Sequence, residues 1–126
     1  MFSWLRRRDE QIYPKDEMGE ALYRFCSNPG KLPAEVAVWY DVYFDAEADA
    51  DAVAKVLEQR RIDVMRDHDE EPNEGYGPWN IDFELPVRAR HIDLKMSHDQ
   101  IGRLVADYRG KIATCDISKW DGDEDE

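Results

Sequence analysis

Hydrophobic and polar residues alternate most regularly in two stretches of the chain, one beginning at Val36 and the other at Trp79. In the first, which ends at Phe44, every second residue is a valine or an aromatic, and the intervening face is only partly polar. In the second, Trp79 to Ala89, apolar positions again recur every two residues. A period of two is typical of strands. Both stretches therefore predict strands, and the apolar character of the first favours a central position in the sheet.

Three further stretches have the spacing of helices that bury one face. The first runs from Asp16 to Ser27, with Asp16 placed to cap its first turn. The second runs from about Ala48 to Arg61, and either Asp45 or Asp49 can cap it. The second helix begins with acidic residues, which the positive end of the helix dipole favours.

The third helix is predicted to begin at Ser97, because residues 97–100 (Ser-His-Asp-Gln) have the sequence of a capping box. It continues to Tyr108, and Gly110 is expected to be the C′ residue after its end. Just before it, Ile92, Leu94 and Met96 alternate with polar residues, which predicts a bend or a short strand.

Shorter segments complete the predicted order. We expect strands at Ile62–Met65 and at Lys111–Ile117. A polar, acidic loop at 67–78 follows the first of them, and the third helix precedes the second. Pro86 lies within the strand that starts at Trp79 and lacks an amide donor, so a bulge or the end of pairing is expected there.

This order, a leading helix followed by β-α-β-β-α-β, predicts an α+β fold of the ferredoxin-like sandwich type. Right-handed crossovers would put both later helices on one face, with the first and third strands central. We divide the chain into an N-terminal segment and helix (1–35), a ferredoxin-like domain (36–120) and an acidic tail (121–126) that is expected to be disordered.

The face opposite the helices would carry the other residues of the two long strands. Trp39, Asp41 and Tyr43 would lie there beside Asp82 and Glu84, with Asn80 next to them. An exposed aromatic pair on such a sheet is typical of RNA-binding modules, but those surround the aromatics with basic residues. Two interpretations remain: the leading helix covers Trp39 and Tyr43 as core, or the aromatics belong to a protein-binding patch.

The charge balance supports a protein partner over nucleic acid. The 126 residues include 29 acidic and 17 basic side chains, for a net charge of −12. Such a surface repels phosphates and anionic lipids, so neither direct nucleic-acid binding nor membrane binding is expected. It suits a basic protein, and the acidic loop residues Asp69, Glu70 and Glu71 are candidate contacts together with the open face.

Catalytic and metal-binding motifs are not evident. Asp82 and Glu84 are two residues apart on one strand face, a separation that any polar strand has. His68 lies in an acidic loop whose start resembles a calcium loop, but Pro72 occupies the position that needs glycine. Cys26 and Cys115 are interpreted as reduced thiols. The sequence predicts a protein that is not an enzyme and holds no cofactor or metal.

The N-terminus predicts a cytoplasmic protein. The arginines Arg6, Arg7 and Arg8 follow a very short apolar piece, which is the reverse of a signal peptide, and no apolar run approaches a membrane span. The three arginines can dock on the acidic surface of their own domain, lie on a membrane, or belong to a flexible terminus.

The block from Val36 to Trp120 resembles the regulator of ribonuclease activity B family, bacterial inhibitors of ribonuclease E. An alternating strand leads into an acidic-capped helix that ends near Arg61-Ile-Asp-Val64. A variable acidic loop, a strand starting at Trp79, the helix 98–108, the turn at Gly110 and an Asp-containing strand closing on Trp120 follow. Unlike family members, this chain separates Asp116 and Trp120 by three residues.

The resemblance implies a small acidic protein that binds a regulatory region of ribonuclease E and lowers RNA degradation without catalysis. The alternative is an immunity-type protein that neutralises a basic toxin domain by covering its active cleft. Both rely on electrostatic complementarity with a basic partner, which should weaken as salt is raised.

Overall fold

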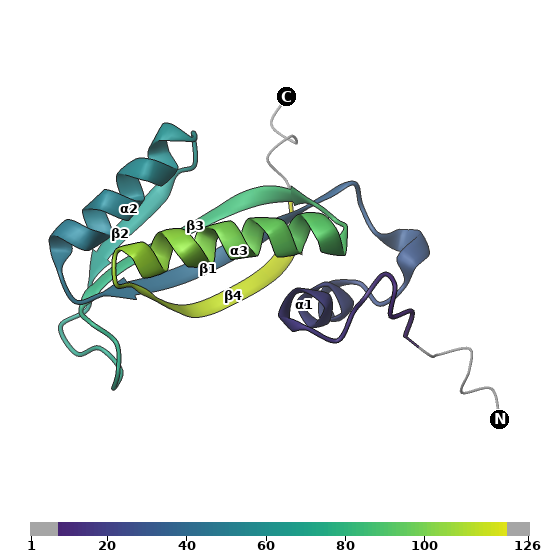
Figure 1. The fold of residues 1–126 in the computed structure, drawn as a ribbon, viewed down its shortest axis with the longest axis horizontal. Coiled ribbons are helices and arrows are strands. Elements are labelled where there is room, and N and C mark those ends of the chain that lie inside the picture. The colour runs from purple at the N-terminus through teal and green to yellow at the C-terminus, as the bar shows by residue number, and fades with distance from the viewer. Residues whose placement is uncertain (1–7, 121–126) are drawn as a thin grey trace.

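The computed structural model describes residues 8–120, which form a four-stranded antiparallel sheet with helices packed on it (Figure 1). The elements, in chain order, are α1 (Glu17–Phe25), the short 3-10 helix η2 (Pro29–Lys31), β1 (Glu35–Phe44), α2 (Glu47–Gln59), β2 (Val64–His68), β3 (Trp79–Arg88), α3 (His91–Asp107) and β4 (Lys111–Lys119). The predicted α+β class, with a leading helix followed by β-α-β-β-α-β, is confirmed.

The strands lie in the order β2-β3-β1-β4, and all neighbours are antiparallel. β1 and β3 are therefore the central strands, as their alternation predicted. α2 and α3 lie on the same face of the sheet (Figure 1). The core fills the space between these layers, where Val36, Val38, Tyr40, Val42 and Phe44 are all buried.

α1 covers the free edge of β4. It packs against α3 and β4, and Figure 1 shows it nearly end-on beside β4. Tyr13, Met18, Ala21 and Leu22 are buried in the same hydrophobic cluster as the sheet, so the N-terminal segment shares one core with the rest of the chain. Because α1 stands at this edge, it does not form a layer over the open face.

The first turn of α1 is capped as predicted, because the Asp16 carboxylate accepts a hydrogen bond of 2.8 Å from the Gly19 amide. Arg8 docks on its own chain, donating to the carbonyls of Tyr13 and Pro14 and to Glu20 at 2.9 Å. The other predictions for the termini, the roles of Arg6 and Arg7 and disorder in 121–126, lie outside the described residues.

The prediction for the start of α3 is wrong. The helix begins at His91, Arg90 is the N-cap without a side-chain cap, and Ser97 lies inside the helix. The alternation of Ile92, Leu94 and Met96 misled because only Leu94 faces the core, while Ile92 and Met96 are more than half exposed.

Both predicted features of the α2 start also differ. α2 begins at Glu47, and its N-cap Ala46 offers no side-chain oxygen, so neither Asp45 nor Asp49 caps it. Asp49 instead accepts hydrogen bonds from the Arg109 guanidinium, the shorter at 2.7 Å. This pairing links the start of α2 to the turn after α3, a contact that local sequence does not reveal.

At the end of α3 the left-handed residue is Arg109, with φ of 61°, rather than Gly110. Gly110 is required for another reason: a Cβ there would collide with the ring of Phe44. The glycine therefore allows the turn to pack directly on the core end of β1.

Strand boundaries and pairing differ in three places. β2 is shifted to Val64–His68, which takes its last residues from the predicted loop, and β4 extends two residues further to Lys119. β3 continues through Pro86, which pairs with Ala37 without a register shift. Because β2 begins with Val64 opposite Phe83, that side of β3 has no partner strand near Pro86, and proline is tolerated there. Within residues 8–120, the one register shift between paired strands lies between β1 and β4, at Asp41/Val42.

Candidate functional site

The open face of the sheet brings together acidic side chains from all four strands. Strand register places Trp39, Asp41 and Tyr43 of β1 on the face opposite α2 and α3, because the alternating residues of β1 are buried beneath the helices. The same register adds acidic residues from the neighbouring strands, namely Asp82 and Glu84 of β3, Asp67 of β2 and Asp116 of β4. The predicted strand residues of the site thus share one face.

Trp39 lies between two of these acids. Its partner residue on β3 is Glu84 and its partner on β4 is Asp116, and both acidic residues are exposed. Trp39 itself is half-buried, so part of its indole remains accessible on the open face. Directly paired residues of neighbouring antiparallel strands have Cβ atoms about 5 Å apart. The indole is therefore flanked on both sides by a carboxylate.

One residue pair further along, two carboxylates face each other directly. Asp41 pairs with Asp82, and burial raises the pKa of Asp82, with a further rise from the charges of Asp41 and Asp67. Asn80 is buried and donates through Nδ2 to the Asp41 carboxylate and, at 3.0 Å, to the Val42 carbonyl. This amide orients Asp41 but carries no charge, so the crowding of negative charge is left uncompensated.

A hollow of about 480 Å³ continues the acidic face beyond β2. It is lined by Tyr43, His68 and Asn80 together with the acidic residues Asp67, Asp69, Glu70 and Glu71. Burial raises the pKa of Tyr43, and the charges of Asp41 and Asp69 raise it further. The three predicted loop acids are therefore brought to the same surface as the strand residues.

The loop that forms this hollow is held at its base and near its tip. The Asp69 amide donates to the Pro78 carbonyl at 2.8 Å, and the Lys111 ammonium donates to the Gly75 carbonyl at 2.6 Å. Tyr76 packs its ring against Tyr43, with 5.4 Å between ring centroids. The tip of the loop thus covers part of Tyr43. From the sequence, this residue was expected to be covered by the leading helix or to contact a protein partner.

Two acidic residues of this face lie outside the strand residues that were predicted for it. Asp67 was expected in the acidic loop that forms part of the contact, although it continues β2, and Asp116 was not predicted as a site residue. Alternation along β2 and β4 was the available signal, since both residues lie on the polar side of their strands. The added acids extend the site across the full width of the sheet.

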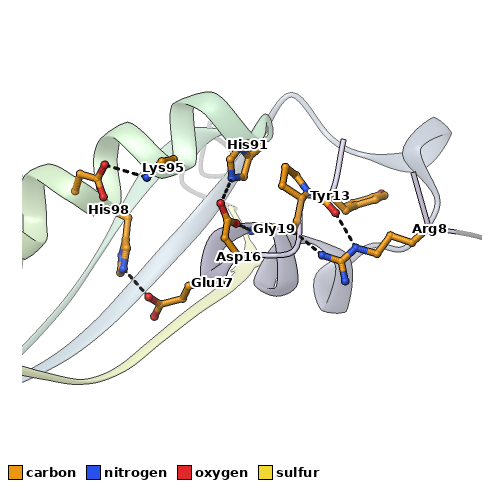
Figure 2. A network of polar contacts seen from close by, with 10 residues as sticks. Arg8, Tyr13, Asp16, Glu17, Gly19, His91, Lys95 and His98 are labelled. Carbon is orange, nitrogen blue, oxygen red and sulfur yellow. Dashed lines mark hydrogen bonds and ion pairs between the residues drawn. The ribbon is translucent and has the colours of Figure 1, made fainter. Parts of the chain in front are cut away.

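A second cluster of titratable side chains lies at the other side of the sheet, where α1 meets α3 (Figure 2). Nε2 of His98 lies 3.0 Å from Oε1 of Glu17, and Nδ1 of His98 lies 2.9 Å from the Tyr40 hydroxyl. His91 Nε2 is 2.7 Å from Oδ2 of Asp16. The two histidines of α3 thus hold the first turn of α1.

Cys115 also reaches this cluster, with Sγ at 3.8 Å from Nδ1 of His98. A cysteine, a histidine and a glutamate in contact have the order of a nucleophile, a base and its orienting group. Here, however, burial raises the pKa of the Cys115 thiol to about 11, and Tyr40 occupies the same histidine nitrogen at a shorter distance. The thiol is neutral near pH 7, and the arrangement fixes α1 instead of activating a nucleophile.

Metal-binding clusters and membrane-spanning helices are absent from the part of the chain that the structure describes. Within residues 8–120, no three His, Cys, Asp or Glu side chains are grouped so that they could hold a metal ion. None of the helices in the same residues has the length and apolar character needed to cross a bilayer. Comparison of the chain with protein-family models and with curated proteins gave no match.

Proposed function

We propose that this protein is a non-catalytic, acidic regulator that binds a basic segment of a protein partner on the open face of its sheet. The observation that carries the proposal is the placement of half-buried Trp39 and Tyr43 among carboxylates contributed by all four strands. Aromatic residues are enriched at protein interfaces, and complementary charge speeds association and selects the partner.

The raised pKa of Asp82 supports this proposal independently of the aromatics. Burial raises the pKa of Asp82 most, and the charges of Asp41 and Asp67, separated from it by no more than a neutral amide, raise it further. A cationic side chain placed over these residues would relieve the repulsion and lower that pKa. Binding of a basic segment therefore gains from charges that are unfavourable in the free protein.

The family resemblance suggests the partner. We infer that the fold is a ferredoxin-like sandwich, a proposal supported by the strand order β2-β3-β1-β4 and by crossovers that each skip one strand. A cytoplasmic inhibitor of ribonuclease E with this fold would bind the enzyme away from its RNA and slow RNA degradation, without contacting nucleic acid or membrane itself.

The test is binding of the full chain to purified ribonuclease E, measured by calorimetry at low and high salt. We expect binding that weakens as salt is raised, and slower RNA cleavage when the protein is added. Glu84→Gln should weaken binding. Asp107→Asn is the matched control, because it removes the same charge from the exposed C-terminal end of α3.

Failure to bind ribonuclease E contradicts the assignment of this partner. A capture experiment from the native host then identifies the partner class, since an immunity-type protein would recover a toxin. If Glu84→Gln and Asp107→Asn weaken binding equally, the open face is not the contact and the site proposal is wrong.

A further inference from the structure

We propose that Trp39, Glu84 and Asp116 bind an arginine side chain of the partner, so that the partner is recognised through arginine and discriminated from one that offers only lysine. This inference rests on the proposed function, because it assigns a specific contact to the open face. It goes beyond general attraction between an acidic surface and a basic segment.

The position of Trp39 is the first argument. Of the three cross-strand rows in the middle of the open face, only this row has an aromatic between two acids. In the next row Asp41 lies between Asp82 and Thr114, and in the third Tyr43 lies between Asn80 and Lys111. The last row therefore already contains a cation, and the middle row has no ring on which one could stack.

The second argument is the chemistry of the two basic side chains. A guanidinium is planar and weakly hydrated, so it can lie flat on an indole while its N–H groups point outward in the plane. Carboxylates on the strands beside Trp39 are placed to accept those N–H groups. An ammonium is a compact, strongly hydrated charge, and it gains less from such a flat, three-sided site.

The chain itself contains an arrangement of the same kind. The Arg8 guanidinium lies 5.1 Å from the centroid of the Tyr23 ring and donates to Glu20 at 2.9 Å. This contact shows an arginine that uses an aromatic face and a carboxylate together in this protein. At Trp39 the ring and two carboxylates are present, and among the described residues no cation lies over the ring.

One internal arginine comes near without filling the site. Nη2 of Arg24, from α1, is 3.9 Å from Oδ1 of Asp116, beyond hydrogen-bond distance, and both side chains are more than 60% exposed. An exposed pair of this length contributes little to stability. Oδ1 of Asp116 also accepts a hydrogen bond of 2.8 Å from the Ile117 amide. Both contacts use Oδ1, so a partner's guanidinium can donate to Oδ2 without breaking either of them.

The test uses the full chain and two probes of equal charge, hexa-arginine and hexa-lysine, titrated by calorimetry at the same salt concentration. A cation–π contact at an exposed site corresponds to roughly a threefold to fivefold difference in Kd, so we expect hexa-arginine to bind tighter by about that factor. In Trp39→Leu the difference should disappear, while hexa-lysine binds as before.

A second variant tests the inference in case Trp39→Leu does not fold. The double variant Glu84→Gln with Asp116→Asn changes only exposed side chains and should also reduce the preference for arginine. Asp107→Asn is again the control and should preserve the preference. Circular dichroism establishes that each variant is folded before it is titrated.

The outcomes separate this inference from the proposed function. If both probes bind equally to the wild-type chain, arginine recognition is wrong and the acidic binding face stands. If the preference persists in Trp39→Leu, the arginine site lies elsewhere and the inference is equally wrong. If neither probe binds, the face does not attract basic segments, and the proposed function fails with it.

Discussion

Tyr40, in the middle of β1, stacks on His98 of α3 with 5.8 Å between ring centroids and 13° between ring planes. The same histidine contacts Glu17 of α1 through its other nitrogen. A carboxylate can only accept, so in the neutral ring Nε2 carries the proton and Nδ1 accepts from the Tyr40 hydroxyl. One side chain thus connects the sheet, α3 and α1.

Tyr40→Phe should lower the free energy of unfolding by about 1 kcal/mol, because it removes one hydrogen bond from a buried ring and leaves the packing intact. The measurement is urea denaturation at neutral pH. Tyr108→Phe is the control, since its half-buried ring makes no hydrogen bond that the structure records, and it should have little effect. Equal stability of wild type and Tyr40→Phe would contradict the role of this hydroxyl.

Asp16 is expected to act both as a cap and as a charge. Burial alone would raise its pKa, but the Gly19 amide and His91 lower it below the ordinary 3.8. Asp16→Ala should therefore cost about 1 kcal/mol, whereas Asp16→Asn keeps a good cap and should cost less at neutral pH.

The pH dependence distinguishes the two roles of Asp16. A lowered pKa gives stability that is present above pH 3.8 and is lost as the pH falls through the folded-state value. In Asp16→Asn this part of the loss of stability at acid pH should be missing. Measuring the unfolding midpoint as a function of pH would detect the difference. Identical acid profiles for wild type and Asp16→Asn would show that the charge is not used.

Two glycines should respond in opposite directions to alanine. At Gly110 a Cβ meets the Phe44 ring, so Gly110→Ala should destabilise by roughly 1–3 kcal/mol. At Gly102, inside α3, nothing lies within 4 Å of the added atom, and Gly102→Ala should stabilise by about 0.5–1 kcal/mol. Thermal melting of both variants is sufficient, and a loss of stability in Gly102→Ala would contradict the open space seen around it.

Cys115 and Tyr40 should make the protein sensitive to alkali. Burial raises the pKa of Cys115 from 9.0 to about 11, and it raises the pKa of Tyr40 as well. Between pH 9 and 11 the unfolded chain loses the thiol proton and the folded chain keeps it, so the free energy of unfolding falls as the pH rises. Cys115→Ala should show a shallower fall over this window by urea denaturation, with Tyr40 responsible for part of what remains. Parallel profiles would contradict the assignment.

Periodicity predicted most of the fold because the core residues of β1 and β3 alternate without interruption. It failed at α3, where exposed Ile92 and Met96 imitate a strand, since apolar residues on a helix surface carry no information about burial. It also placed the left-handed residue at Gly110 rather than Arg109, because glycine is the usual choice there.

Alternation along the strands also predicted part of the open face. Trp39, Asp41 and Tyr43 follow from the alternation of β1, and Asp82 and Glu84 from that of β3. Asp116 could not be placed beside Trp39, because that pairing depends on the register of β4, which shifts at Asp41/Val42. The position at which α1 docks could not be predicted either, because it depends on contacts between polar residues that are 75 and 81 positions apart in the sequence.

The docking of α1 at the edge of β4 has a consequence for the order in which the chain can be completed. A ribosome makes α1 and β1 first, yet β1 pairs only with β3 and β4, and α1 packs on α3 and β4. The pairing of β1 and the packing of α1 are therefore completed only when nearly the whole chain has been made. The segments synthesised first are among the last to complete their contacts, and loss of β4 alone would leave β1 with a single partner strand, β3, and α1 with α3.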